Sequence, residues 1–164
     1  MAIEIVIEDP RWEAAGIVSL AERAEKAVLE HFGLVEYEPV TELLACDDSR
    51  IAALNTEFRD KPTPTNVLSW PSEDLSAEVA GERPHAPGER FGEMSLGDIA
   101  IAYDTCVREA SEQGKAFDAH VSHLIVHGLL HLLGYDHVRD EDATLMEALE
   151  REILGKMGYD DPYT

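Results

Sequence analysis

The segment from position 120 to position 137 constrains the fold most, because its middle part predicts a helix that has to be buried. Apolar residues occupy nearly every side of that helix, at positions 121, 124–126, 129, 130, 132 and 133. A helix that is apolar all round belongs in a protein core. At about 100° per residue, His120, His123, His127 and His131 fall within an arc of roughly 80°. The sequence therefore predicts a buried helix with a row of imidazoles along one face.

A bound metal ion would explain this buried row, because burying an imidazole is unfavourable unless the ring has a partner. Neutral imidazoles four residues apart on a helix can converge on one ion, which allows His123 with His127 or His127 with His131. Gly134 favours the second pair, since a glycine in the left-handed conformation ends a helix and turns the chain back with His137. We therefore predict that His127, His131 and His137 bind one metal ion.

Three histidines without a fourth protein ligand are typical of a catalytic zinc site, whose open position holds water or substrate. The alternative is that these are core or capping histidines bonded to backbone and carboxylate groups. For the three predicted ligands, that alternative requires a helix pair, a glycine turn and a third histidine to coincide by chance. For His120 and His123 both interpretations stay open. His123 and Asp136 are candidates for orienting a ligand histidine, and Asp136 is equally a candidate helix cap.

The pattern HxxxHxxGxxH also occurs in metzincin peptidases, where a glutamate general base follows the first histidine. Gly128 occupies that position here, so the usual proton acceptor of a zinc peptidase is missing. We expect this glycine to open space beside the metal. A zinc metallopeptidase is therefore an alternative that the sequence does not favour.

The rest of the chain predicts one α+β domain over residues 1–164, with a small mixed four-stranded sheet and about five helices that cover one face. Alternating or β-branched segments predict strands at 3–8, 40–48, 66–70 and 97–103. Helical spacing and stop signals predict helices over 12–32, over a short segment that Asp48 caps, over about 104–113 and over about 141–157, besides the histidine helix. Residues 72–94 are rich in proline, glycine and charge, which predicts a long and mobile loop.

The charge balance restricts the partners of this chain. Its 13 basic and 34 acidic residues give a formal net charge of −21, which repels polyanions at long range. Any nucleic-acid role therefore depends on a local patch, and Arg50, Arg59 and Lys61 form one of the few basic concentrations. A guanidinium can hold a phosphate through two parallel hydrogen bonds and stabilise charge near a metal. The alternative is a solvated surface in which these residues pair with acidic neighbours such as Asp48 and Asp60.

Cysteine usage and hydropathy point to a cytoplasmic protein. Cys46 and Cys106 are far apart in sequence and form no CxxC pair, so we expect neither a disulfide framework nor a cysteine metal site. No apolar segment reaches the roughly 20 residues that span a bilayer, so we expect no membrane partner.

Three motifs in this sequence resemble the YbeY-type endoribonucleases, bacterial ribosomal-RNA maturation factors. "HLIVHGLLHLLGYDH" is similar to the family signature HGxLHLxGYDH, and "NTEFRDKPTPTNVLSWP" resembles its NxxFRxxxxxTDVLSFP segment. "GDIAIA" looks like the family's GDI strand, and all three motifs occur in the family's order. With the order of strands and helices included, the resemblance covers most of the chain.

The resemblance implies an α+β fold, one zinc ion on the three histidines, and hydrolysis of single-stranded RNA in ribosomal RNA maturation, at the 3′ end of 16S rRNA, and in ribosome quality control. It implies that Arg59 matches the family's functionally important arginine. The expected partners are ribosomal RNA or a ribosomal subunit with a protein partner, and not DNA. The chain departs from the family pattern at Asn66, where aspartate is usual, at Trp70, where phenylalanine is usual, and in its longer 72–94 loop.

These inferences suggest a mechanism in which zinc lowers the pKa of a bound water or polarises a phosphoryl oxygen while Arg59 anchors the phosphate. Lys61 is a further candidate for substrate binding, and no residue is a secure general base. A second alternative is a ribosome-assembly factor without catalytic activity, in which a structural zinc would have a fourth protein ligand.

Overall fold

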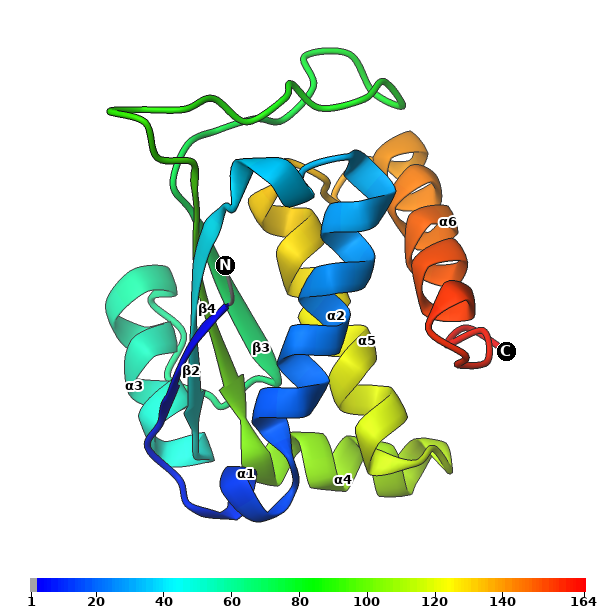
Figure 1. The fold of residues 1–164 in the computed structure, drawn as a ribbon. Helices are drawn as coiled ribbons and strands as arrows, with labels where there is room; N and C mark the ends of the chain where they lie inside the picture. The colour runs from blue at the N-terminus through cyan, green and yellow to red at the C-terminus, as the bar shows by residue number, and fades with distance from the viewer. Residues whose placement is uncertain (1–2) are drawn as a thin grey trace.

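A mixed four-stranded sheet forms the framework of the computed structural model, which describes residues 3–164 (Figure 1). The strands are β1 (Glu4–Ile7), β2 (Val40–Cys46), β3 (Val67–Pro71) and β4 (Ser95–Ala102), in the spatial order β1-β2-β4-β3. β1 and β2 are parallel, as are β2 and β4, whereas β3 pairs antiparallel with β4 at the sheet edge. The predicted α+β class and mixed sheet are confirmed.

Six α-helices and one short 3-10 helix lie within residues 3–164, one α-helix more than predicted. The additional helix arises because the segment predicted as one helix over 12–32 contains Gly16, whose positive φ of 78° breaks it. The helices are α1 (Arg11–Ala14), α2 (Ile17–Phe32), η1 (Val35–Tyr37), α3 (Asp48–Arg59), α4 (Tyr103–Gln113), α5 (Phe117–Leu132) and α6 (Asp140–Lys156).

The histidine-bearing helix α5 occupies the centre of the fold. It contacts α2, α4, α6 and the strands β3 and β4, and Figure 1 shows it beside α2 over one face of the sheet. Its apolar residues Ile125, Leu129 and Leu130 have no solvent-exposed surface. The prediction of a buried helix is therefore confirmed, and its position fixes the histidines against the sheet edge.

Helices cover both faces of the sheet, so the expectation that they cover a single face was wrong. α3 packs on the face opposite α2 and α5, where Ile51 joins a second small core with Leu68 and Ala100 (Figure 1). Cys46 belongs to this second core and Cys106 to the main one, and both are free thiols. The Phe58 ring in the last turn of α3 lies 5.5 Å from the Trp70 ring of β3 between centroids, so this turn reaches the same sheet edge as α5.

The cap of α3 also differs from the prediction by one residue. Asp47, not Asp48, is the N-cap, and its side chain accepts a hydrogen bond from the backbone N–H of Arg50 at 2.8 Å. Asp48 instead accepts hydrogen bonds from the backbone N–H and the hydroxyl of Thr105 at 2.9 and 2.8 Å. This carboxylate therefore ties the start of α3 to the first turn of α4.

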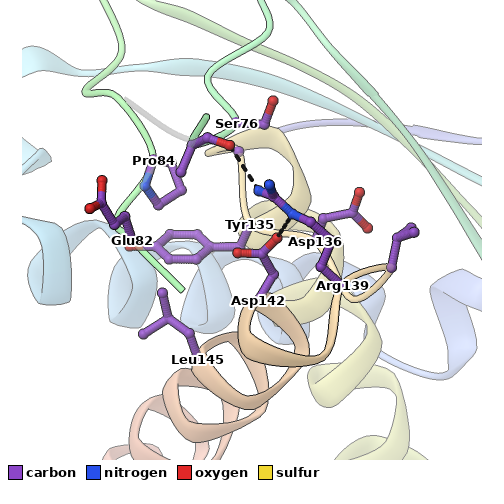
Figure 2. A pocket seen from close by; sticks show the side chains of 11 residues that line it. Ser76, Glu82, Pro84, Tyr135, Asp136, Arg139, Asp142 and Leu145 are labelled. Carbon is purple, nitrogen blue, oxygen red and sulfur yellow. Dashed lines mark hydrogen bonds and ion pairs between the residues drawn. The ribbon is translucent and has the colours of Figure 1, made fainter. Parts of the chain in front are cut away.

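The long 72–94 loop crosses one end of the molecule and is attached to the start of α6 (Figure 1). The guanidinium of Arg139 donates to the carbonyls of Ala77 at 2.8 Å and Glu78 at 3.2 Å, and it pairs with Asp142 at 2.5 Å. Asp142 also accepts the backbone N–H of Gly81 at 2.9 Å. Figure 2 shows Arg139 and Asp142 in the pocket between the loop and the α5–α6 junction. The middle of the loop is thus bonded to the helical part of the fold.

Within residues 3–164, no helix is both long and apolar enough to cross a membrane.

Candidate metal centre

The structure brings the three predicted ligands together at the C-terminal end of α5. His127 and His131 lie one helical turn apart, and one ligand nitrogen from each of the three histidines lies within 4.8 Å of the others. The Nε2 atoms of His127 and His131 are 3.0 Å apart, and the His137 ring lies 5.3 and 5.0 Å from the two other rings between centroids. Imidazole nitrogens that converge in this way form a donor set that suits zinc and similar divalent ions.

Gly134 makes the turn that returns His137 to the helix. Its φ is +100°, and its N–H donates to the carbonyl of His131 at 3.0 Å, which ends α5 as predicted. A Cβ atom at this position would lie 2.8 Å from the backbone of Leu75 and from the side chain of Pro84. Glycine is therefore required both by the backbone conformation and by the close approach of the 72–94 loop.

His131 is held in the neutral form that a metal ligand needs. Burial and, to a smaller extent, positive charge on His127 and His137 lower its pKa to about 4. Only a neutral imidazole has a nitrogen lone pair for a metal ion, so the local environment favours the ligand state at neutral pH.

Glu150 is a member of the cluster that the sequence analysis missed. Its carboxylate is fully buried, with Oε2 3.1 Å from Nδ1 of His127 and Oε1 3.1 Å from Nε2 of His123. The hydroxyl of Tyr163 donates to the same carboxylate. Burial alone would raise the pKa of Glu150, but these three hydrogen bonds hold it at about 2.

A sequence signal for Glu150 did exist. Glu150 lies four residues after Met146 and three before Ile153, so it falls on the buried face of α6. A lone carboxylate on the apolar face of an amphipathic helix requires a buried partner. The sequence could not identify that partner, because the contact between α5 and α6 depends on the tertiary fold.

The remaining candidate near the ligands, Asp136, is engaged locally. Its carboxylate accepts the backbone N–H of His137 at 2.7 Å, in an exposed turn after α5. Within residues 3–164 it forms no hydrogen bond to a ligand ring and does not cap the helix. Of the two candidates for orienting a ligand histidine, His123 is therefore the one that shares a partner, Glu150, with His127.

A cleft of about 570 Å³ opens beside the three histidines. Its walls come from the last residue of α3, from residues 65–67, 69 and 71 in and just before β3, from the loop residues 73–76 and from the turn 134–138. The cleft therefore joins the candidate metal centre to two sequence segments that are distant along the chain.

The basic residues that the sequence analysis grouped together are separated in the structure. Arg59 lines the cleft at the end of α3, and its side chain has no ion pair within residues 3–164. Arg50 pairs with Glu8 at 3.3 Å, and Lys61 is exposed outside the cleft lining. Of these three residues, Arg59 alone reaches the candidate site.

Gly128 does not open space beside the histidines, contrary to the expectation from sequence. A Cβ atom there would lie 3.1 Å from the side chain of Ile99 and 3.2 Å from the hydroxyl oxygen of Ser69. The absence of a side chain instead lets α5 approach the sheet closely. Gly128 thus supports the packing that positions His127 and His131.

Asn66 has a structural reason to differ from aspartate. Its side-chain N–H₂ group donates to Oε1 of Glu109 at 3.0 Å, and the same oxygen lies 3.0 Å from Nε2 of His120. An aspartate at position 66 would place a second carboxylate against Glu109, whereas the amide can donate. His120 is therefore partnered by Glu109 and lies outside the three-histidine cluster.

The family model and the sequence relatives indicate the same family. A family model described as endoribonuclease YbeY matches residues 4–158. A Ruegeria pomeroyi protein with this name is 61% identical over 165 residues, which cover 100% of this chain and 99% of the relative. A Paracoccus denitrificans protein of the same name is 56% identical over 161 residues, covering 98% of this chain and 89% of the relative. The solution structure of a Thermotoga maritima protein has a TM-score of 0.54 at 22% identity, covers 99% of both chains, and supports the fold alone.

Proposed function

This chain belongs to the YbeY family of endoribonucleases, and on that premise we propose that it is a single-domain, metal-dependent hydrolase that cleaves single-stranded RNA. One observation carries the proposal: three convergent histidine nitrogens open onto a cleft that Arg59 also lines. In this proposal the enzyme acts in the cytoplasm on ribosomal RNA, in maturation of the 16S 3′ end and in ribosome quality control.

In this proposal, different residues of the cleft bind the metal ion and the phosphate. His127, His131 and His137 hold the ion, for which the neutral state of His131 is suited. When bound, zinc acts as a Lewis acid, which lowers the pKa of water and polarises a phosphoryl oxygen. The guanidinium of Arg59 binds the phosphate through parallel hydrogen bonds and offsets the negative charge that develops during cleavage.

Substrate delivery requires more than the cleft, because the chain carries a formal net charge of −21. Most affinity for free RNA comes from counterions released at basic contacts, and Arg59 is the one arginine or lysine among the cleft residues. We therefore propose that the ribosomal subunit, together with a protein partner, brings the single-stranded segment to this site.

The first experiment removes one ligand. His131→Ala is expected to lose stoichiometric zinc and RNA cleavage together, measured by metal analysis and by cleavage of a labelled single-stranded RNA. Full cleavage with stoichiometric zinc in this variant would contradict the proposal.

The zinc-loaded wild type distinguishes the alternatives when casein and single-stranded RNA are offered side by side. A metallopeptidase would cleave casein and leave the RNA intact, although Gly128 stands where that class carries its general base. A structural zinc would show a fourth protein ligand in metal spectroscopy and no cleavage of either substrate.

A further inference from the structure

The buried carboxylate of Glu150, which contacts both His127 and His123, has a role that the three proposed metal ligands do not cover. His127 presents its two ring nitrogens to different partners: Nε2 lies 3.0 Å from Nε2 of His131, and Nδ1 lies 3.1 Å from Oε2 of Glu150. In a neutral imidazole one nitrogen carries the proton and the other carries the lone pair. A carboxylate accepts hydrogen bonds, so it selects the form with the proton on Nδ1.

We propose that Glu150 is a positioning residue that fixes the tautomer and ring orientation of His127, so that the Nε2 lone pair faces His131 and His137. The inference rests on the proposed function in taking these three histidines as the metal ligands. A carboxylate behind a ligand histidine also makes the ring a better electron donor to the metal. Glu150 thus acts on the metal through His127 and does not touch the substrate.

The carboxylate is itself held in place from two further sides. Oε1 lies 3.1 Å from Nε2 of His123, and the Tyr163 hydroxyl donates to both oxygens. Because a carboxylate accepts hydrogen bonds, His123 and Tyr163 serve as donors to a charge that is fully buried. Nε2 of His123 then carries the proton, and its Nδ1, an acceptor, is buried without a hydrogen-bond partner within residues 3–164.

Tyr163 connects the last residues of the chain to this cluster. The guanidinium of Arg151 lies 5.1 Å from the centre of the Tyr163 ring, and its Nε donates to Asp161 at 3.2 Å. Asp161 in turn accepts the backbone N–H of Tyr163 at 2.8 Å. This small network keeps the phenol over Glu150, so the segment after α6 contributes to the order of the metal centre.

The group His123, His127 and Glu150 is also compact enough to hold an ion, with ligand atoms within 4.8 Å of one another. The two uses compete, because Nδ1 of His127 cannot both donate to Glu150 and bind a cation. A carboxylate with three donors around it already has its partners. The geometry therefore assigns the ion to the three-histidine group and the positioning role to Glu150.

The test compares Glu150→Gln with Glu152→Gln, an exposed glutamate on the same helix that pairs with Lys156. Zinc affinity is measured by competition with a chelator, and the His127 tautomer by ¹H–¹⁵N correlation spectra of the zinc-loaded protein. Glu150→Gln is expected to weaken zinc binding about 10- to 100-fold and to change the His127 ring signals. Glu152→Gln is expected to match the wild type in both.

Tyr163→Phe provides a second variant that leaves the carboxylate in place. It is expected to weaken zinc binding in the same direction as Glu150→Gln but by less, and to show whether the result depends on folding of the glutamine variant. Wild-type zinc affinity in Tyr163→Phe and in folded Glu150→Gln would overturn the inference. Neither readout uses RNA, so a failure of the proposed nuclease activity would be recognised separately.

Discussion

At the scale of single residues, the buried partner of each histidine on α5 determines the role that this histidine can have. The row of imidazoles on α5 separates into members with different partners: Glu109 for His120, Glu150 for His123, and the other two predicted ligands for His131. Helical spacing predicted which rings share a face, but it could not distinguish these partners, which come from α4 and α6. The three predicted ligands lie together because Gly134 makes the turn that the sequence indicated.

Protonation of His131 is expected to make the metal-free protein less stable in acid. Burial lowers its pKa to about 4, whereas an unfolded histidine titrates near 6.5. Between these values the unfolded state binds more protons, so this residue destabilises the folded state progressively as the pH falls from about 6.5 to about 4. The measurement is urea unfolding with a chelator present, for wild type and His131→Gln.

The stability of the wild type relative to His131→Gln should therefore decrease between pH 7 and pH 4.5. A difference in the free energy of unfolding that stays constant over this interval would show that His131 keeps an ordinary pKa in the folded state.

At the scale of elements, local signals predicted most boundaries, and tertiary contacts explain the misses. Gly33 and Gly114 end α2 and α4 in the left-handed conformation that glycine favours, and both ends were predictable. Gly16 has the same conformation but lies inside an apolar pattern that reads as continuous helix. The side of the sheet that α3 covers depends on chain crossovers, which periodicity does not report.

The attachment of the 72–94 loop to α6 is expected to depend on Arg139. Its guanidinium bonds two loop carbonyls, and its partner Asp142 holds the N–H of Gly81. Removing these bonds in Arg139→Ala should speed hydrogen exchange in peptides that cover residues 77–82. Because the pair is partly exposed, the free energy of unfolding should change by less than about 1 kcal/mol.

Lys156→Ala is the control for this prediction, since Lys156 lies on the same helix, pairs with Glu152 and forms no bond to residues 77–82 within residues 3–164. Equal exchange rates at 77–82 in wild type and Arg139→Ala would mean that other contacts fix the loop.

At the scale of the whole molecule, motif identity indicates the substrate class, and the net charge limits how tightly free RNA can bind. The fold class, the buried helix and the gathering of the three histidines followed from hydrophobic and glycine patterns. The choice of RNA over peptide came from Gly128 and from the Arg59 segment. The partner of Glu150 and the packing role of Gly128 could not be derived, because each depends on contacts between distant segments.

The acidic surface predicts weak binding of free RNA with a shallow salt dependence. When the logarithm of the association constant is plotted against the logarithm of the salt concentration, each phosphate contact on a single strand contributes about −0.7 to the slope. With Arg59 as the one arginine or lysine in the cleft, the slope should be no steeper than about −2. Fluorescence anisotropy with a labelled oligonucleotide measures it, and a tight complex with a slope near −5 would show that another surface binds RNA.

The most direct test of the account is RNA cleavage by Arg59→Ala, with bound zinc quantified on the same samples. Arg50→Ala is the matched control, because this arginine lies on the same helix but pairs with Glu8 outside the cleft. We predict that Arg59→Ala keeps stoichiometric zinc and loses about 100-fold or more in kcat/KM, while Arg50→Ala stays near wild type. Wild-type cleavage by zinc-loaded Arg59→Ala would contradict the claim that the arginine and the three histidines form one catalytic site.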